Sequence, residues 1–285
     1  MKPTEFIAKK KRYEILALCG YVMIGVGFVL FIPLGMSNPQ FLFIVTLLFL
    51  SGAIIAGIAS KQFKKLSLEY KRIYISKMVQ EIYPGSTYRP EIGFEKEEVY
   101  HSRILRKADK YFSEDLLEAT YKNINFQSAD VKLQDVRSNG KTTTVVTVFL
   151  GRVYRFDFPK GFKTDMVVLQ PGFGAKWGFG SYTEIKTESI EFNQEFNVLA
   201  KNELNAFEIL TPPFMERLRK LDLKYHDKIV FSFIENKLYV AIKTGVDSLD
   251  LKMFRKMDSE LTKEFELELE DMKSIIDILK FERNI

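Results

Sequence analysis

Residues 15–60 read ILALCGYVMIGVGFVLFIPLGMSNPQFLFIVTLLFLSGAIIAGIAS, and they contain no Asp, Glu, Lys or Arg. Two apolar runs, 15–36 and 41–59, are separated by the polar, helix-breaking segment 37–40. As helices, the runs would be about 33 and 28 Å long, which matches a hydrocarbon core of about 30 Å. Because backbone groups in lipid must be hydrogen-bonded internally, the stretch predicts a transmembrane helical hairpin. A signal peptide is the competing interpretation, but its apolar region is usually only about 7–15 residues long.

Basic residues flank this hairpin on both sides. Residues 1–14 carry five basic and two acidic residues, and residues 61–72 carry five basic and one acidic residue. Since positively charged flanks remain in the cytoplasm, both termini are expected on the cytoplasmic side. We therefore expect a multi-pass membrane protein, with the lipid bilayer as a partner.

The rest of the chain has no excess of positive charge. Of 42 basic and 37 acidic residues, ten basic and three acidic ones lie in the flanks, which leaves 32 and 34 for residues 73–285, a net charge of −2. Nucleic-acid binding needs a basic surface to neutralise phosphates, so we expect no nucleic-acid partner. The single cysteine, Cys19, allows neither an internal disulfide nor a cysteine metal site.

Small residues recur at helical spacing in the second apolar run, which suggests a close helix–helix contact. We expect this stripe to pack on the first run, with homodimerisation as the alternative. Its members are Gly52, Ala53, Ala56, Gly57 and Ser60.

The segment after the hairpin has helical periodicity. Residues 61–83 predict an amphipathic helix that ends at Pro84-Gly85, and residues 95–107 predict a charged helix. Ser113 has the position of an N-cap for a further helix that carries Leu116 and Leu117. We therefore expect a helical connector over 61–124, between a membrane anchor, 1–60, and a cytoplasmic domain, 125–285.

Residues 125–285 predict an α+β domain with a mainly antiparallel sheet, packed helices and a long C-terminal helix, because strands follow one another without regular βαβ alternation. Asn139-Gly140 is a strong hairpin signal, and a second hairpin is expected about Glu235-Asn236. Thr211 with Pro212 predicts a helix start. The expected strands are 131–136, 142–149, 153–158, 166–169, 185–192, 229–233 and 238–242, and the expected helices are 202–209, 212–223 and 258–281.

The order of these segments resembles the bacterial domain-of-unknown-function family 3137. The resemblance is carried by Asp115-Leu116-Leu117-Glu118-Ala119-Thr120-Tyr121, Phe149-Leu150-Gly151-Arg152, Glu195-Phe196-Asn197-Val198 and Leu210-Thr211-Pro212-Pro213-Phe214-Met215. It implies a bacterial two-pass protein of the cytoplasmic (inner) membrane, with a cytoplasmic domain. It implies no reaction and no catalytic residues.

Catalytic, cofactor-binding and metal-binding residues are not indicated. The two histidines, His101 and His226, stand in unlike contexts without nearby ligand spacing. The glycine-rich segment 171–180 could cradle a phosphate, but such loops open a helix, and here a strand is expected to follow. It could also be a plain hairpin connection. In the third interpretation, its aromatic side chains contact a partner or lipid; these are Phe173, Trp177 and Phe179.

The sequence therefore predicts a membrane-tethered cytoplasmic binding or scaffold module, without enzymatic activity and without cofactor, whose protein partner is unknown. The alternative is a membrane-anchored enzyme. Its site would be assembled from distant residues, including Arg152 and Arg155, around the loop 171–180.

Overall fold

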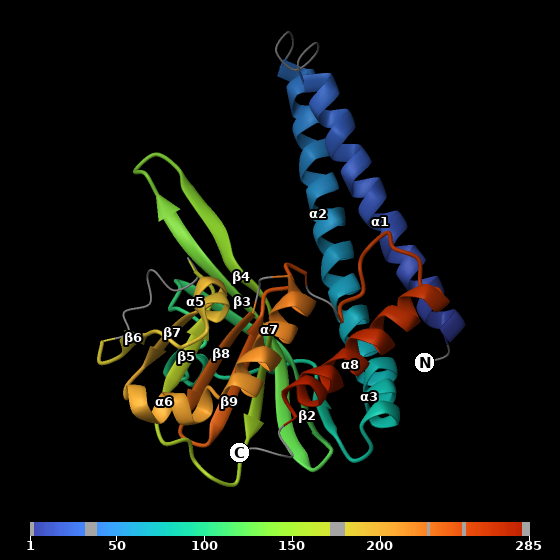
Figure 1. Ribbon diagram of the computed structural model, residues 1–285. Coiled ribbons are helices and arrows are strands. Elements are labelled where there is room, and N and C mark those ends of the chain that lie inside the picture. Colours follow the sequence, from blue (N-terminus) through green and yellow to red (C-terminus); the bar gives the residue numbers. More distant parts are fainter. Residues whose placement is uncertain (1–2, 32–38, 172–179, 227–228, 247–248, 281–285) are drawn as a thin grey trace. The chain divides into compact units, whose positions relative to one another are not determined.

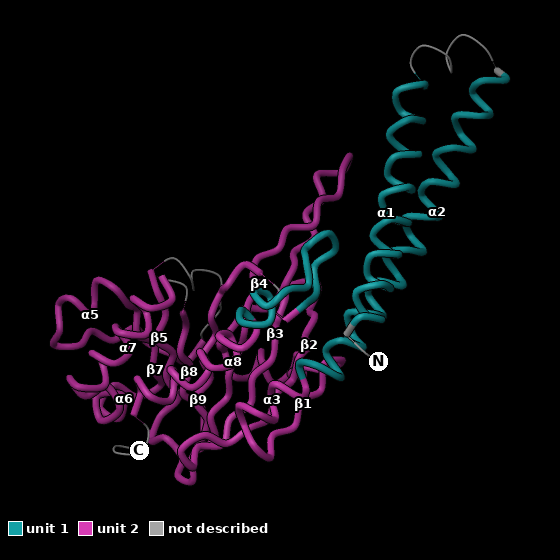
Figure 2. Tube along the Cα trace, turned by 90° about the vertical axis from the view of Figure 1, so that its right-hand side faces the viewer, with its two compact units in different colours: residues 1–75, 250–264 teal, residues 76–249, 265–285 magenta. Residues whose placement is uncertain are grey.

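The computed structural model describes residues 3–31, 39–171, 180–226, 229–246 and 249–280. The chain divides into two compact units (Figure 2). Unit 1 comprises residues 1–75 and 250–264, and unit 2 comprises residues 76–249 and 265–285.

Unit 1 is built on two long helices that lie side by side, α1 (Pro3–Leu30) and α2 (Pro39–Tyr70) (Figure 1). By length and composition, both are apolar enough to cross a membrane. After α2 the chain forms a π-helical turn, η2 (Lys71–Ile75), and then α3 (Ser76–Ile82) in unit 2. The predicted helix over 61–83 and its end before Pro84 are confirmed.

The two long helices approach closely at small residues. A Cβ atom added to Gly20 would lie 2.7 Å from both the Gly52 carbonyl oxygen and the Ala56 nitrogen. A Cβ atom added to Gly52 would likewise lie 2.8 Å from the Gly20 carbonyl oxygen. The predicted packing of the small-residue stripe on the first helix is thus confirmed for Gly52 and Ala56, whereas a Cβ on Gly57 would meet no atom within 4 Å.

The described strands of unit 2 form one sheet, and all of their pairs are antiparallel, which agrees with the predicted mainly antiparallel sheet. Its spatial order is β1-β2-β3-β4-β9-β8-β5-β7-β6. The strands are β1 (Thr87–Arg89), β2 (Lys110–Tyr121), β3 (Ile124–Ser138), β4 (Thr143–Asp157), β5 (Met166–Leu169), β6 (Thr183–Ile185), β7 (Asn197–Ala200), β8 (Ile229–Ile234) and β9 (Lys237–Ile242).

Both predicted hairpins are present. The β3–β4 hairpin turns at Asn139-Gly140 and extends beyond the rest of the sheet (Figure 1), and Gly140 has φ +83°. The β8–β9 hairpin turns at Glu235-Asn236. The strands β3 and β4 contain a β-bulge between Leu133 and Gln134, which shifts their pairing by one residue.

The sheet is covered on both faces. On one face, Phe94, Val99 and Ile104 from the segment around α4 (Lys96–His101) pack on side chains such as Ala129 and Val153. On the other face lie α7 (Pro212–Tyr225) and the part of α8 (Ser259–Leu279) that belongs to unit 2. This two-sided cover explains why every residue of β8 is buried.

The helices of the second face were well predicted. Phe214, Met215, Leu218 and Leu221 are the buried stripe of α7, and the Phe214 ring packs edge-on against Phe233 of β8. The buried stripe of α8 contains the predicted Leu261, Phe265, Met272, Ile276 and Leu279. Unit 2 also contains the short helices α5 (Ile190–Glu195) and α6 (Glu203–Ile209), of which only α6 was predicted as a helix.

Three local predictions were wrong. Ser113 does not cap a helix, because Leu116 and Leu117 belong to β2, between β1 and β3, and long-range pairing overrides the helical composition. The expected helix over 95–107 ends at His101. The expected strand over 185–192 ends at Ile185, since the Ser189 hydroxyl accepts a hydrogen bond from the Phe192 amide and starts α5.

Candidate functional site: a buried arginine–carboxylate cluster

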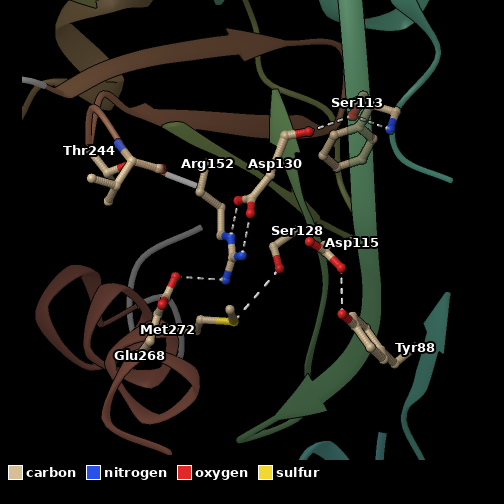
Figure 3. Close-up of polar contacts among 11 residues, drawn as sticks. Tyr88, Ser113, Asp115, Ser128, Asp130, Arg152, Thr244, Glu268 and Met272 are labelled. Atoms are coloured by element: carbon tan, nitrogen blue, oxygen red, sulfur yellow. Dashed lines mark hydrogen bonds and ion pairs between the residues drawn. The ribbon is translucent and has the colours of Figure 1, made fainter. Parts of the chain in front are cut away.

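An arginine lies in the interior of unit 2, on the sheet face covered by α8. The Arg152 Nε donates to Asp130 Oδ1 at 2.6 Å, and its Nη2 donates to Asp130 Oδ2 at 2.9 Å (Figure 3). Its third nitrogen, Nη1, lies 3.4 Å from Glu268 Oε1. The side chains of Arg152 and Asp130 are 3% and 7% exposed, so this bidentate pair is almost fully removed from water.

Strand pairing brings the two charges together. Asp130 on β3 is directly opposite Arg152 on β4, and Arg152 is in turn opposite Ile242 on β9. Gly151 precedes the arginine at a point where a Cβ would lie 2.0 Å from the Ile242 carbonyl oxygen. Only glycine can stand there, and the resulting close approach of β4 to β9 fixes the backbone that carries Arg152.

Electrostatics keep the arginine charged. Burial opposes its charged form, but Asp130 and Glu268 outweigh this effect, so the pKa of Arg152 is raised above its ordinary value. Arg152 therefore cannot serve as a proton donor or acceptor. A buried pair of this kind is costly to break, because each partner left alone would be an uncompensated buried charge.

A second buried carboxylate lies on β2, in the same region of Figure 3. The Tyr88 hydroxyl donates a short hydrogen bond to Asp115 Oδ1, and Asp115 is 1% exposed. Asp115 occupies the irregular part of the β2–β3 pairing with φ +62°, a conformation that few residues other than glycine adopt. Burial, and after it the Asp115 carboxylate, raises the pKa of Tyr88 above 10.0, so the phenol remains a donor.

Polar contacts attach α8 to the rest of unit 2. The Tyr83 hydroxyl donates to the Leu269 carbonyl oxygen at 2.7 Å, and the Tyr225 hydroxyl donates to Asp271 Oδ2 at 2.7 Å. The Ser128 hydroxyl lies 3.7 Å from the Met272 sulfur. Together with the contact between Glu268 and Arg152, these bonds hold residues 268–272 of α8 over the sheet.

The residues singled out from the sequence are not brought together. Phe173, Trp177 and Phe179 lie outside the described residues. His101 is exposed and lies 3.7 Å from Glu235, whereas His226 ends α7 in a left-handed conformation with φ +55°. Among the residues that the structure describes, no group of three or more His, Cys, Asp or Glu could hold a metal ion.

The two arginines considered for an enzymatic site are on opposite faces of β4. Arg155 donates to Glu98 Oε1 of α4 at 2.8 Å and to Asp157 at 3.2 Å. Burial opposes its charge, but the hydrogen bond to Glu98 helps to raise the pKa of Arg155. Both arginines are therefore ion-paired within the fold, and they do not converge on one site.

The sequence analysis did not find Asp130, Glu268 or Asp115 as members of a cluster. One signal was available, because Asp130 and Arg152 interrupt apolar stretches on the two arms of the predicted Asn139-Gly140 hairpin. Counting back from that turn pairs Asp130 with Gly151, however, since the bulge at Leu133 is not visible in the sequence. Glu268 could be placed only once α8 was packed on the sheet.

Comparisons with known proteins give one family and one distant structural similarity. No curated protein matches the chain. The crystal structure of the mycobacterial trehalose monomycolate transport factor A, TtfA, aligns with 73% of this chain and 97% of that chain, at 8% identity and a TM-score of 0.38. Residues 147–281, which contain Arg152 and Glu268, match the family described as Protein of unknown function (DUF3137). This segment of the chain belongs to the DUF3137 family.

Proposed function

We propose that the protein is a membrane-tethered binding or scaffold module, in which α1 and α2 cross a lipid bilayer and unit 2 binds a protein partner. The main observation in support of membrane insertion is that large apolar side chains are exposed on both helices. Phe43 is 72% exposed, Val29 69% and Phe28 63%, and similar side chains follow along the hairpin. Burying each such side chain in an apolar medium is worth about 1.5–3 kcal/mol, so lipid is the natural cover.

The charge pattern supports one orientation. Charged residues reappear on α1 at Glu14 and on α2 at Lys61, and the basic flanks lie at the same end of the hairpin. The positive-inside rule then places both termini and unit 2 in the cytoplasm. The bacterial inner membrane follows from the family resemblance and is part of this proposal.

Cysteine accessibility tests the tether. In a Cys19→Ser background, one variant carries Ser37→Cys, in the sequence between α1 and α2, and another carries Ser138→Cys, at the exposed end of β3. A membrane-impermeant maleimide added to intact cells should label position 37 and leave position 138 unlabelled until the cells are opened. The reverse pattern, or equal labelling of both positions in intact cells, would contradict the topology.

The binding role is supported by apolar residues on the surface of unit 2. Leu204 on α6 is 78% exposed, and Phe207, one turn later, is 37% exposed. Such a pair on one helix face is the kind of anchor that a protein interface buries. Arg152 is buried in ion pairs that stabilise the fold, so we prefer a binding module to an enzyme that uses this arginine.

Site-specific crosslinking tests the binding role. A photoreactive amino acid at position 204 should give a discrete crosslinked species in the native membrane. The double variant Leu204→Ser, Phe207→Ser should no longer co-purify with the partner. The same photoreactive residue at the exposed Lys107 is the matched control. Equal products from both positions would argue against a specific surface on α6.

A further inference from the structure

The segment of unit 1 that precedes α8, residues 250–258, lies against the two long helices (Figure 1). We call it the strap. The Leu251 amide donates to the Ser67 hydroxyl at 3.3 Å, and Asp250 forms an ion pair with the buried Lys71. The Lys10 ammonium donates to the Arg255 carbonyl oxygen at 2.6 Å. These bonds attach the strap to both helices.

The end of the uncharged part of the hairpin can be located on both helices. Gly20 faces Gly52 and Ala56 in the antiparallel pair, so Glu14 on α1 is level with the region around Lys61 on α2. The Lys10 ammonium lies 5.8 Å from the centre of the Phe63 ring, which agrees with this register. In the proposed membrane, the polar boundary of the bilayer therefore lies near Glu14.

The strap reaches that boundary. The Phe254 amide donates to Glu14 Oε1 at 2.7 Å, and Arg255 closes a turn by donating from its amide to the Lys252 carbonyl oxygen at 3.4 Å. Phe254 has φ +66° at this turn, and its side chain is 56% exposed. An aromatic side chain thus stands at the tip of the strap, level with the last charged residue before the apolar run.

Exposed lysines lie on either side of Phe254 in the sequence. The neighbouring Lys252 and Lys256 are both exposed. Among the described residues of unit 1, the exposed basic residues are Lys9, Lys11, Arg12, Lys61, Lys64, Lys65, Arg72, Lys252, Lys256 and Lys263, and the exposed acidic ones are Glu5, Glu69, Asp258, Glu260 and Glu264. The excess of basic residues is complementary to an anionic lipid surface.

We propose that the strap is an interfacial lipid-binding element. The Phe254 ring inserts at the boundary between the headgroups and the acyl chains, where aromatic side chains are favoured. Lys252 and Lys256, with the lysines at the ends of the helices, bind the phosphates of anionic phospholipids. This inference rests on the proposed membrane tether, and it adds a second attachment point next to the start of α8.

Tryptophan quenching in nanodiscs tests the inference on the full chain. In a Trp177→Phe background, a single tryptophan replaces Phe254, Leu47 or Ile190, and the acyl chains of the lipid are brominated close to the headgroup or deep in the bilayer. Leu47 is an exposed residue of α2 and reports insertion of the hairpin, whereas Ile190 is an exposed residue of unit 2. The tryptophan at position 254 should be quenched by the shallow bromine and protected from aqueous acrylamide.

Quenching at the three positions distinguishes a failure of the strap inference from a failure of the membrane tether. Quenching at position 47 without quenching at 254 would overturn the strap inference and leave the tether intact. No quenching at position 47 would overturn the tether itself. Equal quenching at 254 and 190 would indicate general adsorption and would also contradict a specific role for the strap.

Lipid selectivity supplies a second measurement that does not depend on the aromatic substitution. In mixed nanodiscs, spin-labelled phosphatidylglycerol should associate with the protein in preference to phosphatidylcholine. Lys252→Gln with Lys256→Gln should reduce that preference, by up to about fivefold for each lysine near the surface. The matched control is Lys107→Gln with Lys110→Gln, two exposed lysines of unit 2. An unchanged preference in the strap variant would overturn the lipid-binding role of these lysines.

Discussion

Two apolar regions of the chain, the strand β8 and the start of the helix α2, expose their side chains to opposite degrees. All residues of β8 are buried under the helices and the α4 segment, whereas in α2 the residues Phe41, Leu42, Phe43 and Ile44 are all exposed. Apart from Ser232, both regions consist of Ile, Val, Leu and Phe, so hydrophobicity alone does not say what covers a side chain. The sheet has its own core, and the hairpin depends on a medium outside the protein. Four sets of substitutions test this difference, with the stability of the full chain measured in detergent.

The largest effect is expected at the buried ion pair. Arg152→Ala strands Asp130 in the interior and removes the contact of Glu268, whose side chain is 27% exposed. It should lower the free energy of unfolding by about 5 kcal/mol, the upper end of the range for a broken buried pair. Denaturant unfolding followed by circular dichroism measures this loss. As a control, Arg106→Ala breaks a pair whose side chains are 24% and 21% exposed, and it should cost about 1 kcal/mol or less. Equal losses would mean that the Arg152 cluster is hydrated.

Replacing a phenylalanine by alanine compares the core of unit 2 directly with the exposed surface of the hairpin. Phe214 is 4% exposed, so Phe214→Ala should cost about 3–4 kcal/mol through lost burial and an internal cavity. Phe43 is 72% exposed on α2, and Phe43→Ala should cost less than about 1 kcal/mol in detergent. Denaturant titration of both variants gives the two values. A small loss for Phe214→Ala would show that the α7 stripe has been assigned to the wrong face.

Glycine substitutions test whether the hairpin has any tight packing of its own. Gly20→Ala places a methyl group 2.7 Å from the backbone of α2 and should destabilise the helix pair by about 2 kcal/mol. Gly57→Ala meets no atom within 4 Å and should instead stabilise by up to about 1 kcal/mol through helix propensity. Thermal unfolding, followed by the helical circular dichroism signal, should shift in opposite directions. The same shift in both variants would contradict the close contact at Gly20.

The smallest effect concerns Tyr88. Tyr88→Phe removes the hydrogen bond to Asp115 and should cost about 1 kcal/mol at neutral pH. Because the folded-state pKa of Tyr88 is raised above 10.0, the tyrosine stabilises the fold below pH 10 and loses this contribution as the pH rises further. Unfolding titrations from neutral pH to above pH 10 should therefore show a steeper loss for the wild type than for Tyr88→Phe. Parallel curves would mean that this phenol is accessible to water.

Much of the architecture could be predicted because it depends on local patterns. The apolar runs, the turn at Asn139-Gly140 and the start of α7 at Pro212 each follow from a few neighbouring residues. The wrong predictions concern segments whose secondary structure depends on more than their own composition. Residues 110–121 have a helical composition but lie between two strands, and the residues after Ile185 are turned into α5 by a single serine cap.

The sequence by itself determined the two apolar helices, the basic flanks, the α+β class and the buried stripes of α7 and α8, because periodicity and turn chemistry act over a few residues. Only the tertiary structure decided which charges meet. A one-residue bulge at Leu133 changes the register of β3 and β4, and it thereby places Asp130 opposite Arg152 rather than Gly151. The hydrogen bond between Phe254 of the strap and Glu14 likewise joins residues that are 240 positions apart in the sequence. Such contacts depend on register and packing between distant segments, for which the sequence contains no local signal.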